Sequence, residues 1–346
     1  MAADLADTGP DALSIRLTKF LREQSGADSA TVGSLRRLPG GASREIWAFA
    51  AELRRGDAID RHELVVRIDP RGRQLPAGGS AEEFALLEAA AAAGVPVPRV
   101  HWLARDSSVL GAPFFVMDLV PGETLARRLL RDPQYGEARR VMARQLGEIV
   151  ARVHSIDPAP LAFLPRPESG RSPAESELDR YLTLYDTIAT EPHPVFELAF
   201  RWCRAHLPLA GRVTLVHGDY RVGNVVFGPE GMRAVLDWEI AHVGDPMEDL
   251  GWVCVRAWRF GADEKPVGGI GDRSEFFAGY ERVAGISVDP ARVHYWEVFG
   301  NLKWAIICIS QARRHLDGEV VSVELASIGR RAAETEIELL DLIEKG

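Results

Sequence analysis

Lysine is scarce in this chain. Of the 41 basic residues only four are lysines, Lys19, Lys265, Lys303 and Lys345, and the other thirty-seven are arginines. Any function that depends on a lysine ammonium therefore has few candidates. Basic charge is also short overall, because 50 acidic residues give the chain a formal net charge of −9. This balance argues against binding of nucleic acid by broad neutralisation of phosphates, so no nucleic-acid partner is expected.

Cysteines and long apolar runs are few as well. The three cysteines lie about fifty residues apart without a CxxC pair, which fits reduced thiols in a cytosolic protein better than disulfides or a zinc site. The longest apolar stretch, residues 84–97, carries Glu88 and ends in a Gly-Val-Pro-Val-Pro break, so it predicts no membrane span. Residues 1–11 lack the basic and apolar regions of a secretory signal. We therefore expect a cytoplasmic protein without a membrane partner.

Apolar residues are abundant, and their pattern divides the chain. Hydrophobic residues make up 46% of the 346 residues and charged residues 26%, which is enough for a sizeable core or two lobes. The first part has short apolar runs of strand type between two helices: helix 13–24, strands 32–38, 46–53 and 63–68, helix 82–93 and strand 113–119. The second part is mostly helical: helices 137–153, 178–188 and 196–206, strands 213–216, 225–227 and 234–236, and further helices over 245–345.

This order of elements predicts an α+β protein with two lobes. A small β-rich N-lobe would span residues 1–117, a hinge residues 118–122, and a larger, mostly helical C-lobe residues 123–346. A ligand is expected in the cleft between two such lobes.

The residues that carry chemistry concentrate in residues 215–224, Leu-Val-His-Gly-Asp-Tyr-Arg-Val-Gly-Asn. Four residues separate Asp219 from Asn224, and the hairpin that follows turns at residues 228–231 and ends on Asp237. Its antiparallel strands would bring Asn224 and Asp237 to the same edge. A carboxylate that accepts a hydroxyl proton, followed by an amide oxygen and a second carboxylate that hold magnesium, is the arrangement that phosphoryl transfer requires.

With these motifs the chain resembles the aminoglycoside phosphotransferase-like family of the protein-kinase-like fold, which also includes choline and homoserine kinases. The resemblance covers about residues 35–345, and its most specific motifs are His217-Gly-Asp-x4-Asn224, Leu236-Asp-Trp-Glu239 and Gly244-Asp-Pro-x2-Asp249-Leu. It implies a two-lobed protein-kinase-like fold, ATP as the phosphoryl donor with GTP not excluded, Mg²⁺ as cofactor, and a small molecule with a hydroxyl group as acceptor.

The resemblance also implies roles for single residues. Asp219 would be the catalytic base, and Asn224 and Asp237 the magnesium ligands. His217 would brace the catalytic loop, and Asp249 would anchor that loop through hydrogen bonds. Within the same block, Asp245 at N-cap, Pro246 at N1 and Glu248 at N3 predict a strong helix start. His154 ends a predicted helix and is interpreted as a packing or capping residue.

The N-lobe contains the candidate nucleotide site. The loop between two strands carries Gly40, Gly41 and Ser43, whose backbone N–H groups and hydroxyl could cover nucleotide phosphates. In the hinge, the backbone groups of Met117 and Leu119 could pair with an adenine edge.

One position departs from the family pattern. The strand Leu64-Val-Val-Arg-Ile68 carries Arg67 where the resemblance predicts a lysine that contacts phosphate. Its expected partner is Glu83 on the following helix, with the neighbouring Glu82 left open. Arginine keeps the positive charge and can bridge phosphate oxygens, but it lacks the compact ammonium of lysine.

The acceptor is the least constrained part of the interpretation. Residues 252–315 carry nine cations and seven anions, a balance of +2, whereas a polycationic antibiotic would favour a carboxylate-rich pocket. The cations could meet an anionic acceptor or lie on solvated helix faces: Arg256, Arg259, Lys303, Arg313 and Arg314.

The segments Asn301-Leu-Lys-Trp304 and Gln311-Ala-Arg-Arg314 resemble the subgroup of kinase-like domains fused to acyl-CoA dehydrogenases. We therefore expect a kinase acting on a hydroxy acid or hydroxyacyl-CoA. An aminoglycoside phosphotransferase and a non-catalytic nucleotide-binding regulatory module remain as alternatives.

Overall fold

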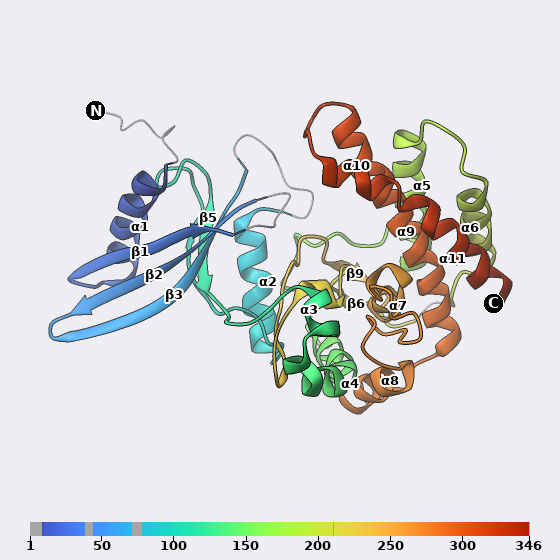
Figure 1. The fold of residues 1–346 in the computed structure, drawn as a ribbon, viewed down its shortest axis with the longest axis horizontal. Coiled ribbons are helices and arrows are strands. Elements are labelled where there is room, and N and C mark those ends of the chain that lie inside the picture. The colour runs from blue at the N-terminus through green and yellow to red at the C-terminus, as the bar shows by residue number, and fades with distance from the viewer. Residues whose placement is uncertain (1–8, 39–43, 71–77, 210, 346) are drawn as a thin grey trace. The chain divides into compact units, whose positions relative to one another are not determined.

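The computed structural model describes residues 9–38, 44–70, 78–209 and 211–345. The chain forms two compact units, the first made of Met1–Pro121 and Arg233–Glu239 and the second of Gly122–Met232 and Ile240–Gly346 (Figure 1). The sequence places a hinge at 118–122 but does not predict that residues 233–239 return to the first unit.

The first unit is built on a five-stranded antiparallel sheet in the order β1-β2-β3-β5-β4. Its elements are α1 (Pro10–Ser25), β1 (Ser29–Arg37), β2 (Glu45–Arg55), β3 (Ala58–Ile68), α2 (Ser80–Ala92), β4 (Val100–Ala104) and β5 (Phe114–Asp118). All the elements expected from the sequence are present, and β4 is an addition. Its five residues, Val100 to Ala104, are only partly buried apart from the last, so the sequence gives no strong strand signal there.

The two helices cover opposite faces of this sheet. Phe20 of α1 contacts Phe114 at 4.8 Å between ring centroids, and Phe84 of α2 contacts Phe115 at 6.1 Å. Phe114 and Phe115 are consecutive residues of β5, and consecutive strand side chains point to opposite faces. Because Leu64, Val66 and Ile68 of β3 belong to the core under α1, the intervening Arg67 lies on the α2 face.

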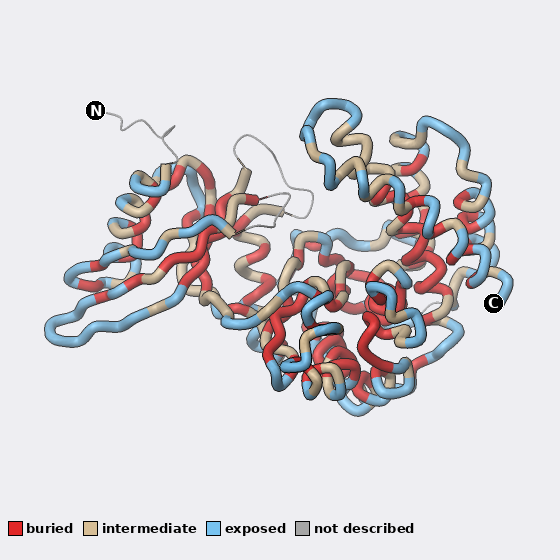
Figure 2. The backbone as a smooth tube through the Cα atoms, viewed as in Figure 1, coloured by how far each residue is buried: buried red, intermediate tan, exposed pale blue. Residues whose placement is uncertain are grey.

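The second unit is mostly helical. Its α-helices within the described residues are α3 (Ala126–Arg131), α4 (Gly136–Val153), α5 (Pro173–Ile188), α6 (Pro194–Ala205), α7 (Met247–Cys254), α8 (Arg273–Ala284), α9 (Pro290–Leu316), α10 (Val323–Gly329) and α11 (Ala332–Lys345). The longest, α9, packs against α5, α6, α7, α10 and α11. Figure 2 shows that buried residues follow β2, β3 and β5 in the first unit and the interior of α9 in the second. The α+β class, with one β-rich unit and one larger helical unit, is as the sequence predicts.

Short strands occur between Thr214 and Gly244, a segment that belongs to the second unit except for Arg233–Glu239. β6 (Thr214–Val216) pairs antiparallel with β9 (His242–Gly244), and β7 (Val225–Gly228) pairs with β8 (Gly231–Val235). The predicted hairpin is therefore present. The strand β9 was not expected, because three residues are too short to show a periodic pattern.

The helix start predicted at Asp245 is confirmed to within one residue. Helix α7 begins at Met247 with Pro246 in the assigned N-cap position, and the Met247 N–H donates to Asp245 Oδ1 at 3.0 Å, the contact expected of a capping aspartate. The other oxygen, Oδ2, accepts hydrogen bonds from Arg292 Nε at 2.7 Å and Trp296 Nε1 at 2.8 Å, both on α9. The side chain of Glu248 pairs with His242 and Lys303, so Glu248 does not complete a capping box.

Across the described ranges, no helix is both long enough and apolar enough to cross a membrane.

Candidate active site

The central loop of the second unit runs from β6 through His217, Gly218 and Asp219 to a short 3-10 helix at Val222–Asn224. Gly218 has a φ of 81°, and a Cβ atom there would lie 2.6 Å from the carbonyl oxygen of Ile240. Only glycine fits this combination of left-handed backbone and close approach. The loop therefore turns sharply just before Asp219.

The Asp219 carboxylate is held by three side-chain donors. Its Oδ1 accepts hydrogen bonds from Arg221 Nε at 2.9 Å and Trp252 Nε1 at 2.8 Å. Its Oδ2 accepts from the Asn224 amide at 2.5 Å. The side-chain orientation is thus fixed by two residues that follow Asp219 in the chain and by Trp252 of α7.

Asn224 is buried and lies against Asp219. Its Nδ2 also donates to the Asp219 backbone carbonyl at 3.0 Å. Because the amide nitrogen makes both of these contacts, the amide oxygen is the atom of this side chain that remains for a cation.

Asp249 of α7 organises the loop from beneath. It is fully buried and accepts hydrogen bonds from the backbone N–H of His217 at 2.8 Å and of Gly218 at 2.9 Å. Burial opposes its ionisation, but the bonds from His154 and His217 hold the pKa of this carboxyl below its usual range. The contacts expected of Asp249 are therefore present in the structure.

Two histidines complete this arrangement. His217 is fully buried, and its Nδ1 accepts a hydrogen bond from the Asp219 N–H at 3.2 Å, so that nitrogen carries no proton. His154, at the end of α4, lies between Tyr280 Oη at 3.1 Å and Asp249 at 3.0 Å. The packing role expected of His154 thus includes support for the residue that holds the loop.

Arg67 lies in the first unit, in a cluster of alternating charges. Its Nη1 contacts Glu83 at 3.0 Å and its Nη2 contacts Glu239 at 3.1 Å. Of the two glutamates left open by the sequence, Glu83 is the partner, because Glu82 caps α2 by accepting from the Gly79 N–H at 2.7 Å. Burial and a neighbouring arginine lower the pKa of Arg67.

That neighbour is Arg44, which sequence reasoning missed. Arg44 is buried and pairs with Glu83 and, at 3.0 Å from its Nε, with Asp69. Glu83 therefore lies between two guanidinium groups, where the family pattern leads one to expect one lysine. Arg44 directly follows the loop that holds Gly40, Gly41 and Ser43, and these three residues lie outside the described residues.

Two further predicted residues lie on or beside β5. Met117 sits inside the sheet, opposite Val65 of β3 and Val100 of β4. Leu119 follows the strand, and its N–H donates to the Glu63 carbonyl at 2.8 Å. The amide of Leu119 is thus already used within the sheet.

Asp237 belongs to the segment that returns to the first unit. It lies two residues after β8 with a φ of 67°, a left-handed conformation that aspartate tolerates better than most residues. Glu239, two residues further, is the carboxylate that contacts Arg67. The predicted site residues of each unit thus gather within that unit: Arg67, Glu83 and the 237–239 segment in the first, and His217, Asp219, Asn224 and Asp249 in the second.

Most cations considered for the acceptor are already paired. Arg259 is buried on the Cys254 carbonyl and Glu297, at 2.8 and 3.0 Å. Lys303 is buried and donates to the Gly218 carbonyl and to Glu248. Arg313 pairs with Asp317, and Arg314 contacts Gln311. Arg259 and Lys303 therefore form internal ion pairs, and they neither lie on a solvated helix face nor remain available to an acceptor.

Aromatic residues extend from Asp219 toward a cavity of about 640 Å³. Trp252, which donates to Asp219, lies 5.2 Å from Trp258, and Trp258 lies 4.7 Å from Trp304, measured between ring centroids. Trp304 lines the cavity, together with the cations Arg127, Arg256 and Arg331 and the anions Asp263, Glu334 and Glu338. The lining therefore balances three positive against three negative side chains.

Sequence reasoning missed Arg221, Trp252 and the loop contact of Lys303. Trp252 follows Asp249 by three residues, so on a helix it shares a face with the residue that holds the loop, and this spacing could have identified it. Arg221 lies two residues after Asp219 in the loop, and nothing in the sequence besides this proximity indicates that the two side chains are in contact.

The curated proteins that share sequence with this chain include two acyl-CoA dehydrogenase family members. Acyl-CoA dehydrogenase family member 10 of Mus musculus is 34% identical over 200 residues, which cover 56% of this chain and 18% of that protein. Acyl-CoA dehydrogenase family member 11 of Pongo abelii is 28% identical over 325 residues, covering 86% of this chain and 41% of that protein. The chain thus spans less than half the length of these relatives.

Solved structures share the fold. A protein from Ralstonia eutropha, provisionally described as an aminoglycoside phosphotransferase, superposes with a TM-score of 0.75 at 23% identity, covering 96% of this chain and 98% of that chain. A thermostable variant of the aminoglycoside phosphotransferase APH(4)-Ia, in a ternary complex with AMP-PNP and hygromycin B, gives 0.61 at 16% identity and covers 95% and 98%.

A model of one protein family matches a large part of the sequence. The model of the phosphotransferase enzyme family (APH) covers residues 34–286. This range takes in β2 to β5 of the first unit, the loop of Asp219 and the helix of Asp249. With well over half of its length matched, the chain belongs to the phosphotransferase enzyme family.

Proposed function

We propose that the protein transfers the γ-phosphoryl group of ATP to a hydroxyl group of a small molecule, with Asp219 as the catalytic base. The observation that carries this proposal is the Asp219 carboxylate, which Trp252, Arg221 and Asn224 hold in one orientation. A base held in this way keeps one position relative to the attacking oxygen, which is what proximity catalysis requires.

In this reaction the acceptor oxygen attacks the γ-phosphorus as its proton passes to Asp219. A bond forms between the acceptor oxygen and phosphorus, and the bond from phosphorus to the bridging oxygen breaks, so ADP leaves with the electron pair. Since little covalent chemistry is needed from the protein, positioning and charge carry the catalysis.

Asn224 and Asp237 are the proposed magnesium ligands. The donor set fits, because the Asn224 amide turns its nitrogen toward Asp219, and magnesium prefers carboxylate and amide oxygens. When bound, Mg²⁺ would neutralise charge on the phosphate oxygens.

Arg67 is the proposed cation at the phosphates. Glu83 and Glu239 hold its guanidinium on two sides, which supports a group of fixed orientation that donates hydrogen bonds to phosphate in its own plane. Gly40, Gly41 and Ser43 would cover the phosphates, and the backbone of Met117 and Leu119 would meet the base. For Leu119 the carbonyl is the group proposed, because its N–H donates to Glu63. GTP remains an alternative donor, because backbone contacts of this kind do not select between the two purines.

The acceptor we propose is a hydroxy acid or a hydroxyacyl-CoA. The cavity beyond Trp252 supports this choice, because Trp304 and three arginines line it and its charges balance. An aminoglycoside carries several positive charges and would be better met by a carboxylate-rich lining. The similarity to acyl-CoA dehydrogenase family members points to the same class of acceptor.

A direct test incubates the protein with Mg²⁺, a bacterial cell extract and ATP carrying ¹⁸O in its γ-phosphoryl group, and searches for labelled products by mass spectrometry. A labelled acid or CoA ester is the expected product. Asp219→Asn should lower the rate of labelling by a factor of about 10²–10⁴, as expected for loss of a general base, while ATP affinity changes little. Retained labelling in this variant would refute the role of Asp219.

The same design distinguishes the other functions. A labelled aminoglycoside, with raised resistance of a susceptible host, would favour antibiotic phosphorylation over the proposed acceptor. Binding of ATP without any labelled product, across extract and a library of hydroxyl compounds, would favour a regulatory module.

A further inference from the structure

Lys303 is one of the four lysines of the chain, and it is buried within the second unit with 1% of its side chain exposed. Its Nζ donates to the Gly218 carbonyl at 2.9 Å and to Glu248 at 3.0 Å. The same nitrogen lies 4.7 Å from the centre of the Trp252 ring. A buried ammonium on α9 therefore contacts both the residue before Asp219 and the residue that donates to Asp219.

A chain of opposite charges fixes Lys303 in place. Glu248 contacts Lys303 through Oε1 and His242 Nε2 through Oε2, both at 3.0 Å. The other ring nitrogen of His242 lies 3.0 Å from the Ile240 carbonyl. Because both ring nitrogens face oxygen acceptors, both carry protons and the ring is positively charged. Burial lowers the pKa of His242, but Glu248 and Glu177 outweigh burial and raise it to about 9.

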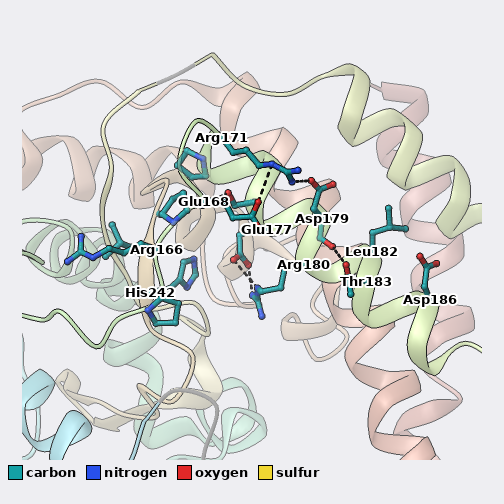
Figure 3. Close-up of a pocket in the computed structure, with 16 residues that line it drawn as sticks. Arg166, Glu168, Arg171, Glu177, Asp179, Arg180, Leu182, Thr183, Asp186 and His242 are labelled. Carbon is teal, nitrogen blue, oxygen red and sulfur yellow. Dashed lines mark hydrogen bonds and ion pairs between the residues drawn. The ribbon is translucent and has the colours of Figure 1, made fainter.

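Glu177, His242 and Glu248 also have the ligand types of a metal site, with their nearest atoms within 4.8 Å. Their charges are already balanced, since Lys303 pairs with Glu248 and Arg180 pairs with Glu177. Figure 3 shows Arg180 joined to Glu177 at a pocket of about 560 Å³ that His242 also lines. A cation bound here would have to displace a proton from His242, so the geometry favours a network of ion pairs over a metal site.

The backbone of Gly218, the residue before Asp219, is held at both its N–H and its carbonyl. Asp249 accepts from the Gly218 N–H at 2.9 Å, and Lys303 donates to the Gly218 carbonyl. Gly218 has a left-handed φ of 81°, and because glycine has no side chain, its backbone is free to adopt other conformations unless neighbouring residues hold it. Without Lys303, the Gly218 carbonyl would lose the side-chain contact that reaches it from α9.

We propose that Lys303 is a positioning residue that fixes the orientation of Asp219 through the Gly218 peptide and the Trp252 ring. The proposal rests on the proposed role of Asp219 as base. Lysine suits this place because an ammonium donates in several directions from one point. Here the three directions lead to a carbonyl, a carboxylate and an aromatic face.

The test compares Lys303→Met with Glu297→Gln. Glu297 lies on the same helix, is equally buried with 1% of its side chain exposed, and pairs with Arg259 and Arg273. Each substitution removes one partner of a buried ion pair, but both partners of Glu297 lie outside residues 217–224. Both variants should lose thermal stability.

The readouts are amide hydrogen exchange of residues 214–224, the affinity for Mg·ATP, and the turnover in the ¹⁸O-transfer assay. We expect Lys303→Met to speed exchange in this segment and to lower turnover by about 100-fold, as a displacement of about 1 Å does. Its affinity for Mg·ATP should stay within about 2-fold of the wild-type value, since catalytic geometry and not ATP binding is altered. Glu297→Gln should leave exchange in 214–224 and turnover as in the wild type.

Unchanged exchange in residues 214–224, or a loss of turnover no greater than that of Glu297→Gln, would overturn the proposal. Glu248→Gln provides a second variant that keeps the shape and an acceptor, in case Lys303→Met does not fold. It should loosen the same segment to a smaller extent, and wild-type exchange and turnover in a folded Glu248→Gln protein would also count against the network. If the wild-type protein yields no labelled product, the proposed function fails, whereas the exchange comparison still decides whether Lys303 holds the loop.

Discussion

Replacing Arg67 by the lysine that the family pattern leads one to expect should lower the stability of this protein. In Arg67→Lys a single ammonium replaces a guanidinium whose two Nη atoms reach Glu83 at 3.0 Å and Glu239 at 3.1 Å. Because one nitrogen cannot take both positions, one charge-assisted hydrogen bond is lost. Such a bond contributes about 1.5–3 kcal/mol.

The structure places this cost at the lower end of that range. The side chains of Arg67 and Glu83 are 8% and 6% exposed, but that of Glu239 is 28% exposed. Water can therefore solvate Glu239 when it loses its partner, while Glu83 keeps the ammonium. We expect the free energy of unfolding to fall by about 2 kcal/mol, which lowers the melting temperature by roughly 4–8 °C for a unit of this size.

Calorimetry of Arg67→Lys beside Arg55→Lys tests this reasoning. Arg55 pairs with Asp60 at 2.5 Å, and both side chains are about half exposed, at 46% and 53%. An exposed pair contributes about 0–1 kcal/mol, so Arg55→Lys should shift the melting temperature little. Equal shifts for the two variants would refute the view that the double contact of Arg67 requires an arginine.

Two further predictions concern the second unit. The pKa of His242 is raised to about 9, so its contribution to stability is fully present below about pH 6.5 and is lost as pH rises through 9. The free energy of unfolding in urea should therefore be lower at pH 9.5 than at pH 6.5, and His242→Gln should reduce this difference. Equal differences in the wild type and the variant would contradict a charged His242. Gly218→Ala should cost well over the roughly 1 kcal/mol of left-handed strain and reduce phosphoryl transfer, because its Cβ would meet Ile240 O at 2.6 Å. The control Gly285→Ala, with a φ of 68° and nothing within 4 Å, should show the strain alone, so equal losses in thermal unfolding would show that the close approach at Gly218 has no cost.

The sequence predicts local features of this fold well. Short apolar runs identify β2, β3 and β5, and the Gly-Pro-Glu-Gly turn at 228–231 identifies the hairpin of β7 and β8. Asp219 and Asn224 are also close in sequence, so their hydrogen bond at 2.5 Å follows from a short loop. In each case the partners lie within a few residues or on consecutive strands.

Contacts between distant segments could not be predicted in the same way. Arg67 and Glu239 are 172 positions apart, and Lys303 and Gly218 are 85 apart. A charged residue on an amphipathic helix is usually solvated, so the pattern around Lys303 gives no sign of its burial. At the start of α7, local chemistry predicts the bond from the Met247 N–H to Asp245 Oδ1, but it does not predict that Oδ2 accepts from Arg292 and Trp296, which lie 47 and 51 positions away.

The choice between arginine and lysine at three buried positions follows from the shapes of the two cations. At Arg67 and Arg44 the partners are pairs of carboxylates placed side by side, with Glu83 shared between the two guanidinium groups. A planar fork of donors matches such pairs, and an ammonium does not. At Lys303 the partners surround one point: a carbonyl, a carboxylate and the face of Trp252. An arginine there would need more volume and would direct its donors into one plane, away from at least one partner. The same physical difference thus explains an arginine on β3, where the family pattern leads one to expect lysine, and a lysine beneath the loop of Asp219.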